Sequence, residues 1–185
     1  MRIIAGKAKG HALSAPHGQE TRPTSDRVRE AIFNILAHGT AALQLEGRRV
    51  LDLFAGTGAM GLEALSRGAK FCLFVEDDAQ ARGVIRSNAE ALGFAGMCKI
   101  WRRDATRLGR CAPQPPFGLV FVDPPYGKSL STAALSCLAE GQWLAPGAVV
   151  VVEENSRAIV TVPERLMLIE ERLYGDTRVF YFRGL

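Results

Sequence analysis

The first apolar pattern in this chain is irregular and short. Two part-apolar runs within residues 2–15 flank the polar stretch at residues 7–10, and this arrangement predicts a small β-hairpin. A turn-rich polar segment follows at residues 16–23. The chain is therefore expected to open with a small hairpin extension that is followed by a polar turn.

From Ser25 the apolar residues recur every three or four positions, which is the stripe of an amphipathic helix. The stripe consists of Val28, Ala31, Ile32, Ile35 and Leu36. Thr24 or Ser25 can cap the N-terminus of this helix, and Gly39 ends it. Arg27 and Arg29 fall off the stripe, so both are expected to face outward.

Short apolar runs and helical patterns then alternate along the chain. Strands are expected at residues 50–54, 71–75, 98–102, 119–122 and 148–152. Helices are expected between them at residues 59–66, 79–92 and 130–138. Runs that are apolar on both faces, separated by helices, are typical of a parallel sheet that is covered on both sides.

The C-terminal part of the chain lacks this alternation of strands and helices. Residues 166–173 and 177–182 read as strands with only three residues between them, too few for a crossover helix, so this pair is antiparallel. The predicted fold is α/β and Rossmann-like: a mostly parallel seven-stranded sheet with an antiparallel C-terminal strand, helices on both faces and a small N-terminal hairpin. We divide the chain into an extension at residues 1–22 and a main domain at residues 23–185.

Composition narrows the class of protein. At 185 residues, with 48% hydrophobic and 23% charged residues, one domain with a small appendage is expected. No apolar run approaches the roughly 18 residues of a membrane span, and the N-terminus lacks the apolar stretch of a signal peptide. The four cysteines are scattered without a C-x-x-C spacing, so we expect a reducing cytoplasm, no disulfide and no metal site.

Basic residues gather in two stretches. Residues 1–30 hold six basic and three acidic side chains and so carry +3 of the net +4 charge. A second group comprises Lys99, Arg102, Arg103, Arg107 and Arg110. Basic clusters favour phosphate backbones, although a charge run is also compatible with a plain solvated surface.

A Gly-rich loop follows the first expected strand of the sheet. Gly56, Gly58 and Gly61 fit G-x-G-x-x-G, which lets a ligand approach backbone N–H groups at a helix N-terminus. Nicotinamide and flavin enzymes share this pattern. Asp52, just before the loop, would repel a pyrophosphate, but it can bind the ammonium group of S-adenosylmethionine, directly or through water. Asp52 can alternatively act as a loop cap.

Acidic residues follow the next two expected strands. Glu76 lies 20 residues beyond Gly56, where a carboxylate accepts the ribose hydroxyls of an adenosine cofactor. Asp104 can accept the adenine amino group, with the Ala105 backbone near the ring; taken alone, Asp104 reads as an ordinary loop residue. Together with Phe54 in the Gly-rich loop and Asp77 beside Glu76, these residues complete the expected cofactor site.

Asp123-Pro124-Pro125-Tyr126 ends the fourth expected strand of the sheet. The two prolines fix the backbone and leave carbonyl acceptors without donors. The Asp123 carboxylate and the Pro124 carbonyl can accept the N–H groups of an exocyclic amine and localise its lone pair, while Tyr126 stacks on the ring. Alignment and electrostatics then favour methyl transfer. A rigid Pro-Pro turn is the simpler alternative for such a tetrapeptide elsewhere in a protein.

These residues resemble the class I methyltransferases, and within them the amino-methylating group marked by (D/N/S)-P-P-(Y/F/W). From residue 2 to about 182 the chain resembles the RsmD family of bacterial 16S ribosomal RNA guanine-N2 methyltransferases. The matching stretches are residues 2–6, R-P-T at 22–24, D-R-V-R-E-A-I-F-N at 26–34, L-D-L-F-A-G-T-G at 51–58, G-L-E-A-L-S-R-G-A at 61–69, D-P-P-Y at 123–126 and Y-G-D-T-R at 174–178.

The resemblance implies the substrate, which is one guanine of 16S ribosomal RNA in the small subunit or an assembly intermediate, methylated on N2 with S-adenosylmethionine as cofactor. We expect a cytoplasmic monomer that does not bind membranes. RNA phosphates would be contacted outside the methyl-transfer core. The residues expected to do so are Lys7, Lys9, Arg22, Thr24, Arg27 and Arg29.

Other functions fit parts of the pattern. A DNA adenine-N6 enzyme or a protein-glutamine methyltransferase would use the same chemistry, but the chain has no room for a separate DNA-recognition domain, and the protein-modifying group usually has Asn in place of Asp123. Asp52 and the D-P-P-Y stretch argue against a nicotinamide-dependent oxidoreductase. A non-catalytic RNA-binding module would be expected to have lost Asp123 or the glycines.

Overall fold

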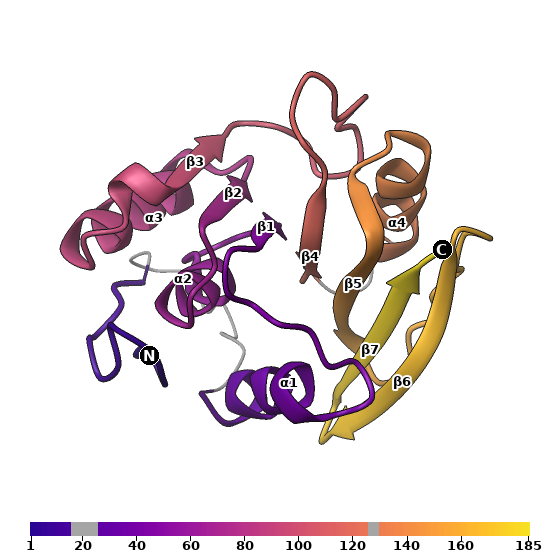
Figure 1. The fold of residues 1–185 in the computed structure, drawn as a ribbon, viewed down its shortest axis with the longest axis horizontal. Coiled ribbons are helices and arrows are strands. Elements are labelled where there is room, and N and C mark those ends of the chain that lie inside the picture. Colours follow the sequence, from indigo (N-terminus) through magenta and orange to yellow (C-terminus); the bar gives the residue numbers. More distant parts are fainter. Residues whose placement is uncertain (16–25, 126–129) are drawn as a thin grey trace.

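The computed structural model describes residues 1–15, 26–125 and 130–185, and its centre is a seven-stranded sheet (Figure 1). The strand order is β3-β2-β1-β4-β5-β7-β6, in which β7 is antiparallel to both its neighbours and the other pairs are parallel. The strands are β1 (Arg49–Leu53), β2 (Phe71–Val75), β3 (Cys98–Trp101), β4 (Phe117–Val122), β5 (Leu144–Asn155), β6 (Leu166–Tyr174) and β7 (Thr177–Gly184). The predicted sheet is confirmed, including its single antiparallel strand near the C-terminus.

Helices cover both faces of the sheet, as predicted. One face packs against α1, α2 and α3, and the other packs against α4 and the loop at residues 105–111 (Figure 1). The helices are α1 (Asp26–His38), α2 (Ala59–Ser66), α3 (Ala79–Ala91), α4 (Leu130–Glu140) and the single 3₁₀ turn η1 (Ala95–Met97).

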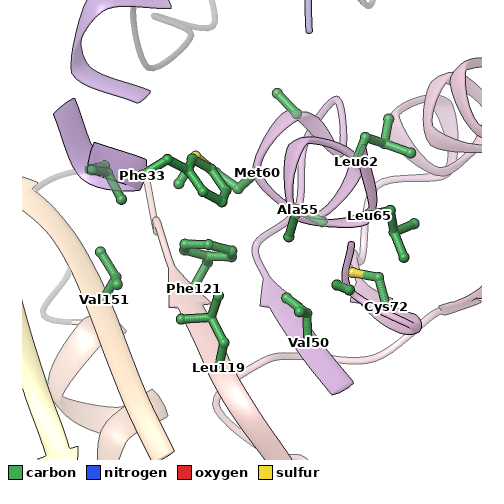
Figure 2. Close-up of a cluster of buried hydrophobic side chains, with 14 of the residues drawn as sticks. Phe33, Val50, Ala55, Met60, Leu62, Leu65, Cys72, Leu119, Phe121 and Val151 are labelled. Carbon is green, nitrogen blue, oxygen red and sulfur yellow. The ribbon is translucent and has the colours of Figure 1, made fainter. Parts of the chain in front are cut away.

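Alternation along β1 shows how the sheet separates two hydrophobic cores. Val50 joins the cluster under α1, α2 and α3, whereas Leu51 and Leu53 join the cluster under α4. Figure 2 shows the first cluster, where Phe33 of α1 lies against Phe121 of β4 with ring centroids 5.6 Å apart. Asp52 shares the Val50 face, so its carboxylate points toward α2 rather than toward solvent.

The strand order reverses direction at β1, which positions the functional site. From β1 the chain runs outward through β2 and β3, then returns to place β4 on the other side of β1. Leu53 pairs with Val122, so the carboxyl ends of the two central strands lie level with each other. Ligands of open α/β sheets bind at such a switch point.

Element boundaries differ from the prediction most in β5. The strand begins at Leu144 rather than at residue 148, because Phe117 pairs with Leu144 and Leu119 with Val149 across an irregularity in register. A β-bulge of this kind absorbs the Pro146-Gly147 step that would otherwise break the ladder.

The N-terminal segment forms a short hairpin that is docked on the main domain. In residues 1–15, which we call the N-terminal strap, the two arms pair around an antiparallel bridge between Arg2 and Ala12, and the Ile3 amide donates to the His11 carbonyl. Ile3 and Leu13 are buried in the same cluster as α1 and α2. Gly6 has φ +82°, and a Cβ there would overlap the Ser66 backbone at the end of α2. The strap is therefore continuous with the core of the main domain.

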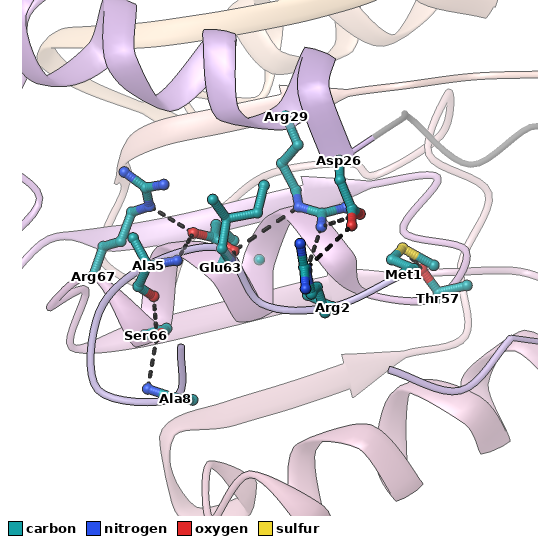
Figure 3. Close-up of polar contacts among 12 residues, drawn as sticks. Met1, Arg2, Ala5, Ala8, Asp26, Arg29, Thr57, Glu63, Ser66 and Arg67 are labelled. Atoms are coloured by element: carbon teal, nitrogen blue, oxygen red, sulfur yellow. Dashed lines mark hydrogen bonds and ion pairs between the residues drawn. The ribbon is translucent and has the colours of Figure 1, made fainter. Parts of the chain in front are cut away.

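A buried carboxylate on α2 holds the strap and α1 together (Figure 3). Glu63 is fully buried, and it accepts hydrogen bonds from the Ile4 and Ala5 amides at 2.8 and 3.0 Å and from Arg67 Nε at 2.7 Å. Arg29 Nε lies 3.9 Å from its Oε2. Three segments distant in sequence are thus fixed by one side chain.

Arg29 is buried, so the prediction that it faces outward was wrong. Its guanidinium donates to the Arg2 carbonyl and to Asp26 Oδ1, and its side chain has no exposed surface. The buried residues of α1 are Arg29, Ile32, Phe33 and Leu36, so the buried face is rotated by about one residue from the expected stripe. The buried guanidinium is compensated by its hydrogen bonds to Arg2 and Asp26 and by the charge of Glu63, which is buried opposite α1.

Two further findings concern the whole described chain. All four cysteines are free thiols. Within the described ranges, the helices are too short and too polar to cross a membrane.

We predict that Arg29→Met destabilises the fold, because it leaves the Arg2 carbonyl and the buried Glu63 carboxylate with fewer partners. The expected loss is about 3 kcal/mol of unfolding free energy in urea titrations. Arg27→Met, an exposed position on the same helix, is the matched control and should change stability by less than about 0.5 kcal/mol. Equal effects of the two substitutions would contradict a special role for Arg29.

Candidate active site

The Gly-rich loop joins the end of β1 to the start of α2, and its glycines have two different structural roles. Gly56 and Gly58 have φ of +53° and +77°, a conformation that other L-residues rarely adopt. Gly61 lies in the first turn of α2, where a Cβ would overlap Phe74 and Cys72 of β2. The first two glycines therefore shape the loop, and the third lets the helix approach the sheet.

The backbone of Phe54 also adopts the left-handed conformation, with φ +57°. A non-glycine residue in this region costs on the order of 1–3 kcal/mol and is maintained only where its surroundings demand it. Here its half-buried side chain packs against the core under α4. The chain therefore turns sharply at the end of β1, directly before the loop that we assign to the cofactor.

The buried Asp52 side chain holds the end of this loop by a hydrogen bond. It is 2% exposed, and its Oδ2 accepts a hydrogen bond from the Gly61 amide at 2.9 Å. Burial raises the pKa of Asp52 to about 8, the Glu76 charge adds to this effect, and the Gly61 N–H opposes it. Asp52 thus caps the N-terminus of α2, the alternative role foreseen from the sequence. Contact with a cofactor ammonium stays a prediction.

Glu76 links the end of β2 to the same loop. Its Oε2 accepts from the Gly56 amide at 2.8 Å, and its Oε1 accepts from the Asp78 amide at 2.9 Å. A carboxylate has about four lone-pair sites, so two remain for the ribose hydroxyls that the sequence assigns to it. Asp77 beside it is exposed.

Asn88 is a member of this site that the sequence did not reveal. It is 3% exposed on α3, and its Nδ2 donates to the Thr57 carbonyl in the centre of the loop at 3.1 Å. The loop is therefore fixed by three side chains: Glu76 at Gly56, Asn88 at Thr57 and Asp52 at Gly61. Asn88 lies in no motif, and a polar residue in a helix gives no sign of the loop that it will meet.

Asp104 and Ala105 follow β3 at the same edge of the sheet. Asp104 is exposed, and its Oδ1 accepts from the Thr106 hydroxyl and amide. The Thr106 hydroxyl, and then its amide, hold the pKa of Asp104 below the ordinary value. Ala105 is buried in the core under α4. Asp104 is thus an ionised acceptor at the rim, bonded locally to its own turn.

The D-P-P stretch lies beside the Gly-rich loop. Asp123 directly follows β4, and its amide is 3.5 Å from the Leu53 carbonyl at the end of β1. Asp123 is half-buried, Pro124 is buried and Pro125 is exposed. Tyr126 lies outside the described residues. Two motifs separated by about 70 residues in sequence therefore meet at the carboxyl ends of adjacent strands.

The residues predicted to bind RNA are divided by the structure. Lys7 and Lys9 in the strap are exposed, and so is Arg27 on α1. Lys7 Nζ lies 4.7 Å from the centre of the Phe94 ring, and the Lys7 amide donates to the Ser66 carbonyl at the C-terminal end of α2. Arg29 is excluded from phosphate contact by its burial. Arg22 and Thr24 lie outside the described residues.

No cluster of three or more His, Cys, Asp or Glu side chains suited to a metal ion occurs in residues 1–15, 26–125 and 130–185. The acceptors at the edge of the sheet are instead spaced along four strand ends. Such a row suits an elongated organic ligand with several hydrogen-bonding groups.

Known proteins resemble this chain in sequence and structure over almost its whole length. The Bacillus subtilis protein YlbH is 37% identical over 188 residues, covering 99% of this chain and 98% of that protein. The Escherichia coli K12 protein named Ribosomal RNA small subunit methyltransferase D is 36% identical over 177 residues, covering 95% of this chain and 86% of that protein. The solved structure of Escherichia coli yhhF superposes with a TM-score of 0.84 at 34% identity, covering 100% of this chain and 97% of that one.

A family model matches the chain as well. The model described as Conserved hypothetical protein 95 covers residues 1–183. This span includes the strap, the Gly-rich loop, the D-P-P-Y stretch and the final hairpin, all of which carried the resemblance in the sequence. The chain belongs to the Conserved hypothetical protein 95 family, the RsmD family that its motifs indicate.

Proposed function

We propose that this protein transfers a methyl group from S-adenosylmethionine to the exocyclic N2 of a guanine in 16S ribosomal RNA during small-subunit assembly. The observation that carries the proposal is the meeting of the Gly-rich loop and Asp123-Pro124 at the ends of β1 and β4. The choice of ribosomal RNA is supported by the name of the 36% identical Escherichia coli relative. The cytoplasmic location and the monomeric state stay predictions from sequence.

The cofactor would lie along the carboxyl edge of the sheet. When bound, S-adenosylmethionine supplies an electrophilic methyl group on a sulfonium centre. The loop amides at the N-terminus of α2 and the Asp52 carboxylate would face its amino-acid part, and Glu76 would accept the ribose hydroxyls. Asp104 would accept the adenine amino group, with the Ala105 backbone beside the ring.

The amine would be held by acceptors at the end of β4. The N2 of guanine is a weak nucleophile because its lone pair is delocalised into the ring. The Asp123 carboxylate and the Pro124 carbonyl would accept its two N–H groups and localise the lone pair, and Tyr126 would stack on the base. N2 so held would be a better nucleophile toward the methyl group that S-adenosylmethionine supplies, and the proton that N2 loses on methylation would pass to water. Most of the rate enhancement comes from alignment and from fixed charge.

The RNA would approach from the strap side. A stacked base cannot reach this site, so the target guanine must be splayed out or flipped. Lys7, Lys9 and Arg27 are exposed and available for phosphates, and we keep Arg22 and Thr24 as proposed contacts from the sequence. Residues 1–22 would thus serve as the RNA-binding extension of the catalytic domain at residues 23–185.

The decisive test of substrate is methyl transfer from tritiated S-adenosylmethionine to small ribosomal subunits, naked 16S RNA, duplex DNA and a glutamine-containing protein. We expect label only in the ribosomal RNA samples, recovered as N2-methylguanosine after nucleoside digestion. Label in N6-methyladenosine or in protein would support the two related amino-methyltransferase functions instead. An NAD titration serves as the control for an oxidoreductase and should show no binding.

We predict that Asp123→Ala lowers methyl transfer by about 10²–10³-fold, since it removes one fixed acceptor at the reacting nitrogen. Binding of S-adenosylhomocysteine, measured by calorimetry, should stay within about twofold of the wild-type value. Asp176→Ala, an exposed position in the β6–β7 turn, is the control and should leave both quantities unchanged. An active Asp123→Ala enzyme would rule out the acceptor role.

We predict that cofactor binding releases a proton from Asp52. With a pKa of about 8, most Asp52 is protonated at pH 7 in the free protein, and a bound cation lowers that pKa. Calorimetry of S-adenosylmethionine binding at pH 7, in buffers of different ionisation enthalpy, should therefore show more proton release for the wild type than for Asp52→Asn. The difference should fade above pH 9, where Asp52 is already ionised. Identical proton counts at pH 7 would place Asp52 outside the cofactor's reach.

A further inference from the structure

Asn88 makes three hydrogen bonds that join the N-terminal strap to the Gly-rich loop. Its Oδ1 accepts from the Ser14 amide at 2.8 Å, and its Nδ2 donates to the Ser14 carbonyl and to the Thr57 carbonyl, each at 3.1 Å. The side chain is 3% exposed, so water competes little for these groups. One amide thus bonds both backbone groups of a strap residue and the backbone of the cofactor loop.

Only an amide in one orientation satisfies all three partners. The Ser14 amide is a donor, so it requires an acceptor, whereas the two carbonyls require donors. A carboxylate at position 88 would keep the first bond and set its second oxygen against two carbonyl oxygens. A methyl group would leave three buried backbone groups without these bonds. Asn is therefore fitted to this junction by chemistry as well as by size.

The strap is also secured independently of Asn88. The Ile4 and Ala5 amides bond to Glu63, and the Ala8 amide bonds to Ser66 Oγ at 3.0 Å (Figure 3). Glu63 and Ser66 belong to the helix that begins at the Gly-rich loop. Asn88 thus links the strap end at Ser14 to Thr57, while the rest of the strap is anchored separately to α2.

We propose that Asn88 is a positioning residue that couples the strap to the cofactor loop, so that RNA held by the strap and cofactor held by the loop strengthen each other's binding. The cofactor half follows from the contacts of the loop, and the RNA half rests on the proposed function. Linkage requires the coupling to be equal in both directions. The occupant of the strap is ribosomal RNA, recognised through its phosphates by the exposed Lys7 and Lys9.

The cofactor half is tested by calorimetric titration of S-adenosylhomocysteine into the full chain. Asn88→Asp and Asn88→Ala should weaken binding about tenfold, which corresponds to the loss of one or two hydrogen bonds that hold the loop. Asn34→Asp makes the same chemical change at an exposed site on α1 and should have no effect. Folded Asn88 variants that bind like the wild type would overturn the proposal.

Ser14 gives a second test that leaves Asn88 and the loop untouched. Ser14→Pro removes the amide that donates to Asn88 Oδ1, whereas Ser14→Ala keeps it. Ser14→Pro should weaken S-adenosylhomocysteine binding severalfold, and Ser14→Ala should not, although Ser14 touches no residue assigned to the cofactor. Equal affinities for the two variants would show that Ser14 does not act on the loop through Asn88, and this result would overturn the proposal.

The coupling between RNA binding and cofactor binding is measured by equilibrium dialysis of labelled S-adenosylhomocysteine with and without saturating 16S RNA transcript. The wild-type affinity should rise about fivefold with RNA, and this factor should fall toward one in Asn88→Asp. A merely structural role for Asn88 would lower stability and leave the factor unchanged, which would contradict the proposal. If neither this transcript nor small ribosomal subunits bind, the proposed function fails, and Asn88 is still judged by the two titrations without RNA.

Discussion

The close approach of α2 to β2 at Gly61 is the constraint on which the rest of the site depends. A side chain at this position would overlap Phe74 and Cys72, so only glycine lets the helix pack at this distance. The same approach brings the Gly61 amide within 2.9 Å of Asp52, which then caps the helix from inside the sheet. It also buries the middle of α2, so that Glu63 is enclosed and must find hydrogen-bond donors. The docking of the strap and the burial of Arg29 follow from that requirement.

Much of the fold follows from local sequence, but the cross-connections do not. Continuous apolar runs, the three-residue turn before β7 and the spacing of Gly56, Gly58 and Gly61 each act within a few residues of themselves, so their structural outcome could be predicted. Arg29 and Asn88 differ because their environment is set by residues 34 and 31 positions away, namely Glu63 and Thr57. Helical periodicity places a charged residue on the outside by default. Only the buried carboxylate opposite α1 reverses that choice.

The buried carboxylates Asp52 and Glu63 differ in how the protein compensates their negative charge. Glu63 is surrounded by two amides and two guanidinium groups, so its charge is compensated within the protein. Asp52 accepts a hydrogen bond from the Gly61 amide, but it is buried and has the Glu76 charge nearby, and its pKa rises to about 8. The first group is therefore a fixed structural charge. The second would gain its charge most readily if a cation entered the site, which agrees with the proposed contact between Asp52 and the cofactor ammonium.

The length of α2 sets a lower limit on the RNA that such a site could use fully. The Gly-rich loop lies at the N-terminal end of this eight-residue helix, whereas the Lys7 amide bonds to Ser66 at the other end. Eight residues of α-helix span about 12 Å. A ligand that contacts both ends of this helix must therefore span roughly this distance. A single guanosine could fill the base site of the proposed function without reaching the strap at the same time. Under the proposed function, a longer RNA would use both ends of α2, and the hydrogen bonds of Asn88 connect the Gly-rich loop to the strap at Ser14, away from the Lys7 contact with Ser66.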